Sequence, residues 1–260
     1  MPAVNLRIHG AALLLGALVL SMTPSTQVLA QAPAVDPAAT QILQRMTEYL
    51  DSLTQFSVHT QNDVEDLLDS GQRIDTVVSA SVTVNRPNKL LAERRGEQVD
   101  QVFYYDGKSL TLYNTAGMVY ASEPAPGTIE ETLDFARASL GLLVPAADMV
   151  YRNAYPLMMQ DVTSAIVVGK TVIGGVRCDH LAVSRPDVDF QVWVADGDQP
   201  LPYMYVVTDK STPALVSVST VMSEWDVSPD IADERFSFVP PEGVSKIDFM
   251  PVDVSIGTQP

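Results

Sequence analysis

The chain has 260 residues, with 32 Asp and Glu against 16 Lys and Arg, which gives a formal net charge of −16 at neutral pH. This charge argues against nucleic acids and anionic lipid surfaces as partners, because both would repel a strongly negative protein. The single cysteine, Cys178, excludes an intramolecular disulfide framework, so the fold has to be stabilised by an ordinary apolar core.

Residues 1–30 have the pattern of a cleavable secretory signal peptide. Arg7 supplies a basic start, an apolar run covers residues 11–20, and small or apolar residues precede a cleavage site that we place after Ala30. The run is shorter than the roughly 20 residues that a spanning helix needs, and Pro24 interrupts it. We therefore expect a soluble periplasmic monomer without stable membrane insertion.

An amphipathic helix is predicted over residues 36–53. Asp36 followed by Pro37 is typical of a helix N-cap and first turn. Apolar residues then recur at helical spacing on one face, while the other face is polar. The apolar residues are Ile42, Leu43, Met46, Tyr49, Leu50 and Leu53. This face should lie on an apolar surface.

From residue 56 the pattern changes to that of consecutive antiparallel strands. Runs rich in Val, Thr, Tyr and Phe are separated by turns such as 69–71 and 106–107, which are too short for parallel crossovers. The predicted strands of this half cover residues 56–68, 72–84, 89–97, 101–105, 109–113 and 118–121.

A helical insertion is predicted over residues 128–160. Thr128 and Glu131 fit a capping box for a helix that ends at Leu140, and a second helical stretch follows over 145–160. Further strands and a last helical turn are predicted at residues 166–171, 176–184, 189–194, 203–209, 215–225 and 230–235. We expect one α+β domain over residues 31–260, with a curved, mostly antiparallel sheet of about 11 strands that holds the helices on its concave face.

Several short motifs, taken in order and spacing, resemble a family of predicted periplasmic proteins called domain of unknown function 2092. Besides the first helix, they are Val84–Pro87, Ala92–Gly96, Phe103–Lys108, Leu110–Tyr113, Gly174–Leu181, Phe190–Val194 and Phe236–Gly243. The plan of this family in turn resembles the lipoprotein carriers LolA and LolB, whose half-barrel surrounds lipid chains. The resemblance implies a half-barrel with a helical insertion over its concave side, and a lipid-binding function.

Few side chains in the sequence suit catalysis or metal binding. Cys178 and His180 lie two residues apart on one strand face, where a thiolate pair or two metal ligands are conceivable. No further ligands accompany them, so we interpret this pair and His59 as structural. Asp187 and Asp189 lack the spacing of a calcium loop or a carboxylate pair. We expect no enzyme activity, no cofactor and no metal.

Apolar side chains are instead the main candidates for function. Alternate residues of neighbouring strands share the concave face, and three residues of the insertion add flexible side chains that repack around ligands. The candidate cavity residues are Val82, Val84, Phe103, Tyr105, Leu110, Leu112, Leu157, Met158, Met159, Val192 and Val194. The same residue types also form packed cores, so the sequence leaves cavity and core as open alternatives.

The leading hypothesis is a non-enzymatic binding or carrier protein for a hydrophobic small molecule or lipid moiety, such as an acyl chain or a lipoprotein anchor. The first alternative is a protein-interaction or stress-signalling module on the same scaffold, with another envelope protein as its partner. A Cys178-dependent enzyme is the least favoured hypothesis, because no resolving cysteine or general base is identifiable.

Overall fold

The structure, a computed structural model, describes residues 34–97, 99–142 and 146–249. The signal peptide expected at residues 1–30 lies outside this part of the chain. The described residues all belong to one compact unit.

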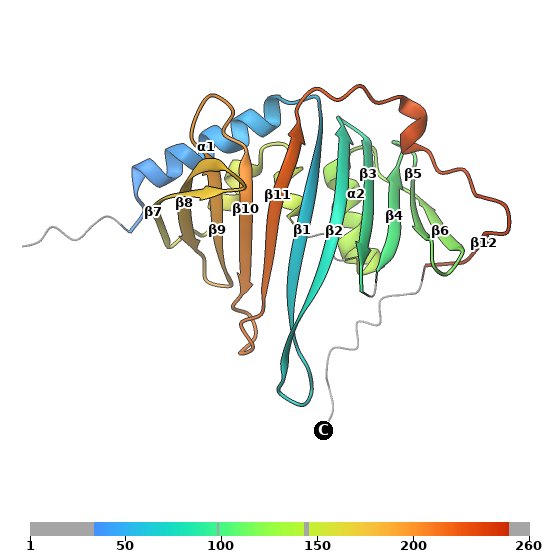
Figure 1. Ribbon diagram of the computed structural model, residues 1–260, viewed down its shortest axis with the longest axis horizontal. Helices are drawn as coiled ribbons and strands as arrows, with labels where there is room; N and C mark the ends of the chain where they lie inside the picture. Colours follow the sequence, from blue (N-terminus) through green and yellow to red (C-terminus); the bar gives the residue numbers. More distant parts are fainter. Residues whose placement is uncertain (1–33, 98, 143–145, 250–260) are drawn as a thin grey trace, which may run out of the picture. The chain divides into compact units, whose positions relative to one another are not determined.

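Within the described residues, twelve strands form one open sheet in the order β12-β6-β5-β4-β3-β2-β1-β11-β10-β9-β8-β7 (Figure 1). The strands are β1 Gln55–Leu67, β2 Arg73–Asn85, β3 Lys89–Gly96, β4 Asp100–Tyr105, β5 Ser109–Asn114, β6 Val119–Pro124, β7 Ser164–Ile173, β8 Val176–Ser184, β9 Val188–Ala195, β10 Pro202–Asp209, β11 Ser217–Asp226 and β12 Ser245–Lys246. Neighbouring strands are antiparallel, except that β12 pairs parallel to β6. The predicted fold class is confirmed, and the two-residue β12 is the strand that the sequence pattern missed.

The pairing of β1 with β11 joins the two halves of the sheet. Each half is a meander of strands that follow one another in the chain, because short turns allow only antiparallel neighbours. The two-residue turn between β7 and β8 needs positive φ values, which Gly174 and Gly175 adopt at 55° and 84°. The order of the strands within each meander therefore follows from the turns, whereas the pairings of β1 with β11 and of β12 with β6 join strands that are far apart in the sequence.

The helices are α1 (Pro37–Ser52), α2 (Ile129–Leu140), α3 (Ala154–Met159) and the short 3₁₀ helices η1 (Ala147–Met149) and η2 (Asp233–Phe236). Helix α1 begins as predicted, because Asp36 Oδ1 accepts a hydrogen bond from the Ala38 amide at 2.8 Å. Helix α2 begins where Thr128 Oγ1 accepts from the Glu131 amide at 3.3 Å, and it ends at Gly141 in the left-handed conformation.

The prediction of a continuous helical stretch over residues 145–160 is wrong. The described residues from 146 onward form η1 and α3 instead, and Asn153 between them has a φ of 53°. Asn tolerates this left-handed conformation, and Pro156 in the first turn of α3 has no amide to donate to a preceding turn. Both residues therefore favour a new helix start. The last helical turn, predicted at 230–235, lies at η2.

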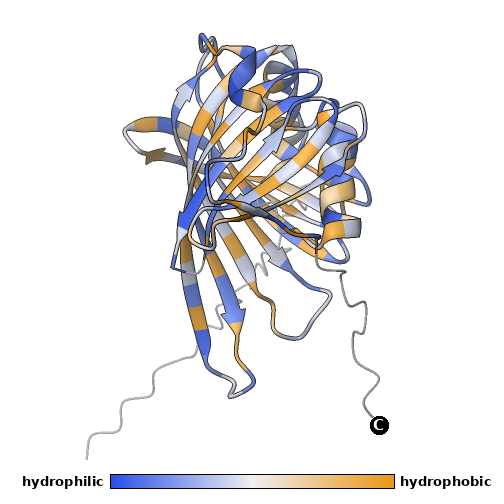
Figure 2. Cartoon of the chain, turned by 90° about the vertical axis from the view of Figure 1, so that its right-hand side faces the viewer, coloured by the Kyte–Doolittle hydropathy of each residue, from blue (hydrophilic) through white to orange (hydrophobic). Residues whose placement is uncertain are grey.

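The core lies between one face of the sheet and the helices. Inward-facing strand residues form a single apolar cluster with residues of α1 and α2, among them Leu43, Met46, Ile129 and Leu133, which are almost completely buried. Hydrophobic and hydrophilic residues alternate along the strands (Figure 2), as expected for a sheet with one covered and one solvated face. This covered face holds the candidate site.

Candidate ligand-binding cavity

Strand register places the inward side chains of β1–β5 in rows that cross the sheet, because directly paired residues of antiparallel strands lie on the same face. The first row is Phe56, Val84, Leu90, Tyr105 and Leu110. The second row is Val58, Val82, Ala92, Phe103 and Leu112. The third row is Thr60, Ala80, Arg94 and Gln101. Polarity therefore increases from the first row to the third.

An apolar cavity lies over the second row and the adjoining parts of the other two. Its lining is Phe56, Val58, Thr60, Asn62, Ala80, Val82, Leu90, Ala92, Arg94, Phe103, Leu112, Leu133, Leu142, Ala146, Ala147, Met149, Val150, Met222 and Trp225. It holds about 890 Å³ of non-atom space with open solvent included, and about 80 Å³ admits the centre of a water-sized sphere.

Three of the residues proposed from the sequence, Val82, Phe103 and Leu112, line this cavity. Five others are packed in the core at 0–1% exposure, and these are Val84, Tyr105, Leu110, Val192 and Val194. The first-row residue Tyr105 is closed off by the approach to α2, since its hydroxyl donates to the Pro126 carbonyl at 2.6 Å. Register thus brings the predicted strand residues to one face and divides them between core and lining.

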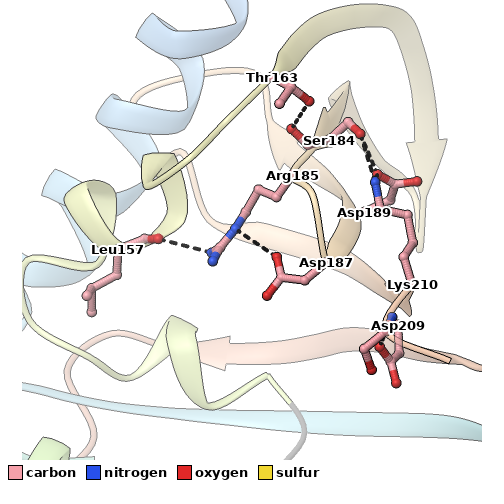
Figure 3. Close-up of polar contacts among 9 residues, drawn as sticks. Leu157, Thr163, Ser184, Arg185, Asp187, Asp189, Asp209 and Lys210 are labelled. Carbon is pink, nitrogen blue, oxygen red and sulfur yellow. Dashed lines mark hydrogen bonds and ion pairs between the residues drawn. The ribbon is translucent and has the colours of Figure 1, made fainter.

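The three predicted residues of α3 lie outside this lining. Met158 is buried in the core, Met159 is partly buried, and Leu157 is 49% exposed. The Leu157 carbonyl accepts a hydrogen bond from Arg185 Nη1 at 3.3 Å, and Arg185 also pairs with Asp187 (Figure 3). These bonds fix α3 to the turn between β8 and β9, so its methionines stabilise the cover of the sheet. Contact between α3 and a ligand stays a prediction.

Several lining residues were not found by sequence reasoning. Thr60 and Asn62 follow Phe56 and Val58 at every second position of β1, and Arg94 follows Leu90 and Ala92 in the same way on β3. The alternation of inward and outward residues along these strands was the signal that could have identified them. A search for apolar residues ends where these polar side chains begin, although they point to the same face.

The polar end of the cavity is organised around Asn62. Its Nδ2 donates to Thr60 Oγ1 and to the Val78 carbonyl, both at 3.1 Å, and its Oδ1 accepts from Thr220 Oγ1 at 2.8 Å. Arg94 lies beside this network. Burial lowers the pKa of its guanidinium, which nevertheless stays charged, because the ordinary value lies far above neutral pH.

Side-chain bonds hold the covering segments over the sheet. Arg86 Nη1 lies 3.4 Å from Glu130 Oε1, which also accepts from the Arg152 amide at 2.9 Å. Tyr151 donates to Asp134 Oδ1 at 2.6 Å, so the chain after η1 is bonded to α2. The cover is therefore fastened at the first-row end of the sheet and along α2.

Cys178 and His180 share a strand face as expected, but they have separate surroundings. Cys178 is completely buried, and burial raises the pKa of its thiol, which weakens it as a nucleophile. The His180 ring stacks on Trp193 with centroids 4.0 Å apart, and its Nε2 forms a hydrogen bond with Gln191 Oε1 at 2.9 Å. Among the described residues, no group of three or more His, Cys, Asp or Glu is arranged to hold a metal ion.

Within the described ranges, no helix is long and apolar enough to cross a membrane. No curated protein matches the sequence. Similar solved structures include the lipoprotein LppX of Mycobacterium tuberculosis, with 14% identity, TM-score 0.44, and coverage of 76% of this chain and 100% of that one. LprF from Mycobacterium bovis has 16% identity, TM-score 0.46, and coverage of 76% and 96%.

A LolA superfamily protein from Nitrosomonas europaea has 13% identity and TM-score 0.37, with coverage of 77% of this chain and 97% of that one. At TM-scores below 0.5 these likenesses are too weak to assign a function. The sequence itself is more informative, because the model of one protein family matches residues 39–250. That match spans most of the chain, which therefore belongs to the predicted periplasmic proteins of domain of unknown function 2092.

Proposed function

We propose that the protein binds or carries a single apolar chain in the periplasm, after export by a signal peptide that is cleaved near Ala30. The observation that carries the proposal is the cavity over the second row. All five residues of that row are apolar and line the cavity, and the cover adds Leu133, Met149 and Val150. Methionine side chains adapt to ligands of varied shape.

The volume of the cavity favours one chain over a lipoprotein anchor with three. A chain of about 16 carbons fills about 480 Å³ if each carbon takes about 30 Å³, the share of a water molecule in the liquid. Three such chains would exceed the 890 Å³ of non-atom space, which already includes open solvent.

Native mass spectrometry of mature protein purified from its own periplasm tests this proposal. We expect a mass increment that corresponds to one single-chain lipid, and its loss after extraction with organic solvent. The extracted protein should bind an apolar fluorescent probe in a one-to-one ratio. If the purified protein carries no lipid and the extracted form binds neither probe nor amphiphile, the proposal is wrong.

An interaction module is the second candidate, and the edge strand β7 favours it. Ile166, Val168 and Val172 are 44%, 53% and 62% exposed on this strand, which ends the sheet. Exposed apolar edge strands pair readily with a strand of another chain. A photocrosslinker at Val172 should then capture one envelope protein, and Val168→Lys should abolish the product. An unchanged crosslink in that variant would argue against strand pairing.

A further inference from the structure

We propose that Arg94 binds the anionic head group of the ligand, so that the ligand is a single-chain amphiphile ending in a carboxylate or a phosphate. The inference rests on the proposed function and adds the chemical class of the ligand. It starts from the position of Arg94 in the third row, directly opposite Ala80 on β2 and Gln101 on β4. Arg94 is two residues beyond Ala92, at the end of the lining that also contains the polar residues Thr60 and Asn62.

Arg94 differs from the other arginines in its surroundings. Among the described residues, only Arg86, Arg94 and Arg185 are arginines with buried or half-buried side chains. Arg86 has Glu130 as a carboxylate partner and Arg185 has Asp187, but Arg94 has no carboxylate of the described part of the chain within 4.0 Å.

The cavity lining itself contains no Asp or Glu among the described residues, and Arg94 is its one charged side chain. Burial lowers the pKa of Arg94, and no neighbouring acid of the described residues offsets this shift. A guanidinium that is partly removed from water without a counter-ion is costly, and an anion that reaches it recovers part of that cost. The site is therefore complementary to a negative charge, in a protein whose net charge is −16.

Asn62 is already engaged, which leaves Arg94 and the Thr60 hydroxyl as donors for a ligand. Both donors of Asn62 Nδ2 have acceptors, and its Oδ1 accepts from Thr220. Arg86 has two guanidinium nitrogens without a partner, but its side chain is 1% exposed and does not line the cavity, so it is a poor competitor for the anion. The planar guanidinium of Arg94 suits the two oxygens of a carboxylate or phosphate, which it can bind with two parallel hydrogen bonds.

The energy of chain burial also calls for a head-group contact. Each buried methylene contributes about 0.8 kcal/mol, whereas association costs at least about 4 kcal/mol, so a short chain alone binds weakly. A charge-assisted hydrogen bond strengthens binding about ten- to hundredfold. Arg94 therefore determines both the affinity and the preference for an anion.

Titration of three ligands with the same chain tests the inference. Lipid-free mature protein is titrated with octanoate, octyl phosphate and octanol, by calorimetry and by NMR chemical shifts for the weakest binder. We expect wild type to bind octanoate or octyl phosphate about ten- to hundredfold more tightly than octanol. The stronger of the two anions identifies the head group as carboxylate or phosphate.

Arg94→Met should remove this preference, so that octanoate, octyl phosphate and octanol bind with similar affinity. Arg95→Met is the matched control, because Arg95 is the next residue of β3, lies on the opposite face and is 78% exposed. Arg94→Lys should have intermediate affinity, since it keeps the charge and loses the paired hydrogen bonds. The comparison of anion with octanol in wild type does not depend on how well any variant folds.

The outcomes separate the two proposals. If wild type binds all three ligands equally and Arg94→Met changes nothing, the role of Arg94 is refuted while the apolar cavity stands. If wild type binds none of the three ligands and no longer-chain probe, the proposed function itself fails. An anion preference that survives in Arg94→Met but is lost in Arg95→Met would also overturn the inference.

Discussion

The substitution Ala92→Leu separates an empty cavity from a packed core by the sign of its effect on stability. Ala92 lies in the second row between Val82 and Phe103 and lines the cavity. In empty space, three added carbons contribute about 0.8 kcal/mol each, from which side-chain ordering removes about 0.5–1 kcal/mol. We expect a gain of about 1.5 kcal/mol in the free energy of unfolding.

The control is Ala165→Leu, which makes the same chemical change in a packed part of the core. Ala165 lies on β7, is 1% exposed and does not belong to the cavity lining. Added carbons have no space there, and overpacking costs about 1–3 kcal/mol. Both variants add the same three carbons, so the space at each site decides the sign of the change in stability.

Urea unfolding of the lipid-free protein measures both effects from the midpoint at an unchanged slope. The Ala92→Leu variant should also lose affinity for octanoate, because leucine takes the space of the chain. A loss of more than about 1 kcal/mol in Ala92→Leu, equal to that in Ala165→Leu, would show that the second row is packed in solution. The carrier proposal would then lose its physical basis.

Three further predictions concern the cover and the turns. Tyr151→Phe removes the hydrogen bond to Asp134 and should lower the unfolding free energy by about 1.5–3 kcal/mol, measured by thermal unfolding. Burial raises the pKa of Asp189, but hydrogen bonds from Lys210 and a serine hydroxyl lower it by more, so the pKa lies below its ordinary value. The stabilisation from this pair is therefore lost as the pH falls through that lowered pKa. Lys210→Met should therefore destabilise the protein by less than about 1 kcal/mol at neutral pH, and the difference from wild type in urea unfolding should shrink as the pH falls through the lowered pKa of Asp189. Gly107→Ala should cost at least about 1 kcal/mol in the same assay, because Gly107 has a φ of 90° and a Cβ would lie 2.5 Å from a side-chain nitrogen.

The elements of the fold were largely predictable because local chemistry determines them. The N-cap at Asp36 and the turn at Asp106–Gly107 lie where the sequence indicated. Local signals also explain the wrong prediction of one helix over residues 145–160, since Asn153 and Pro156 both favour an interruption.

The division between core and cavity was not predictable in the same way. Val84 and Val82 are the same residue type, two positions apart on β2, and both face inward. Val84 is completely buried in the first row, whereas Val82 lines the cavity. The difference in burial between the two valines depends on where the chain before α2 crosses the sheet. The hydrogen bond from Tyr105 to the Pro126 carbonyl marks this crossing over the first row. No pattern within β2 contains that information.

The two inward arginines of this half of the sheet show how the rows form a directional site. At the first-row end, Arg86 faces Phe56 and pairs with Glu130, which also binds the cover, so this end is closed. At the third-row end, Arg94 faces the cavity without an acid of the described residues. An amphiphile that entered head first would have to carry its charge past the apolar second row, which is costly. In the proposed complex, a chain that binds with its apolar end toward Phe56 keeps its head group beside Arg94. We therefore expect the polarity of the rows to favour this orientation of the ligand.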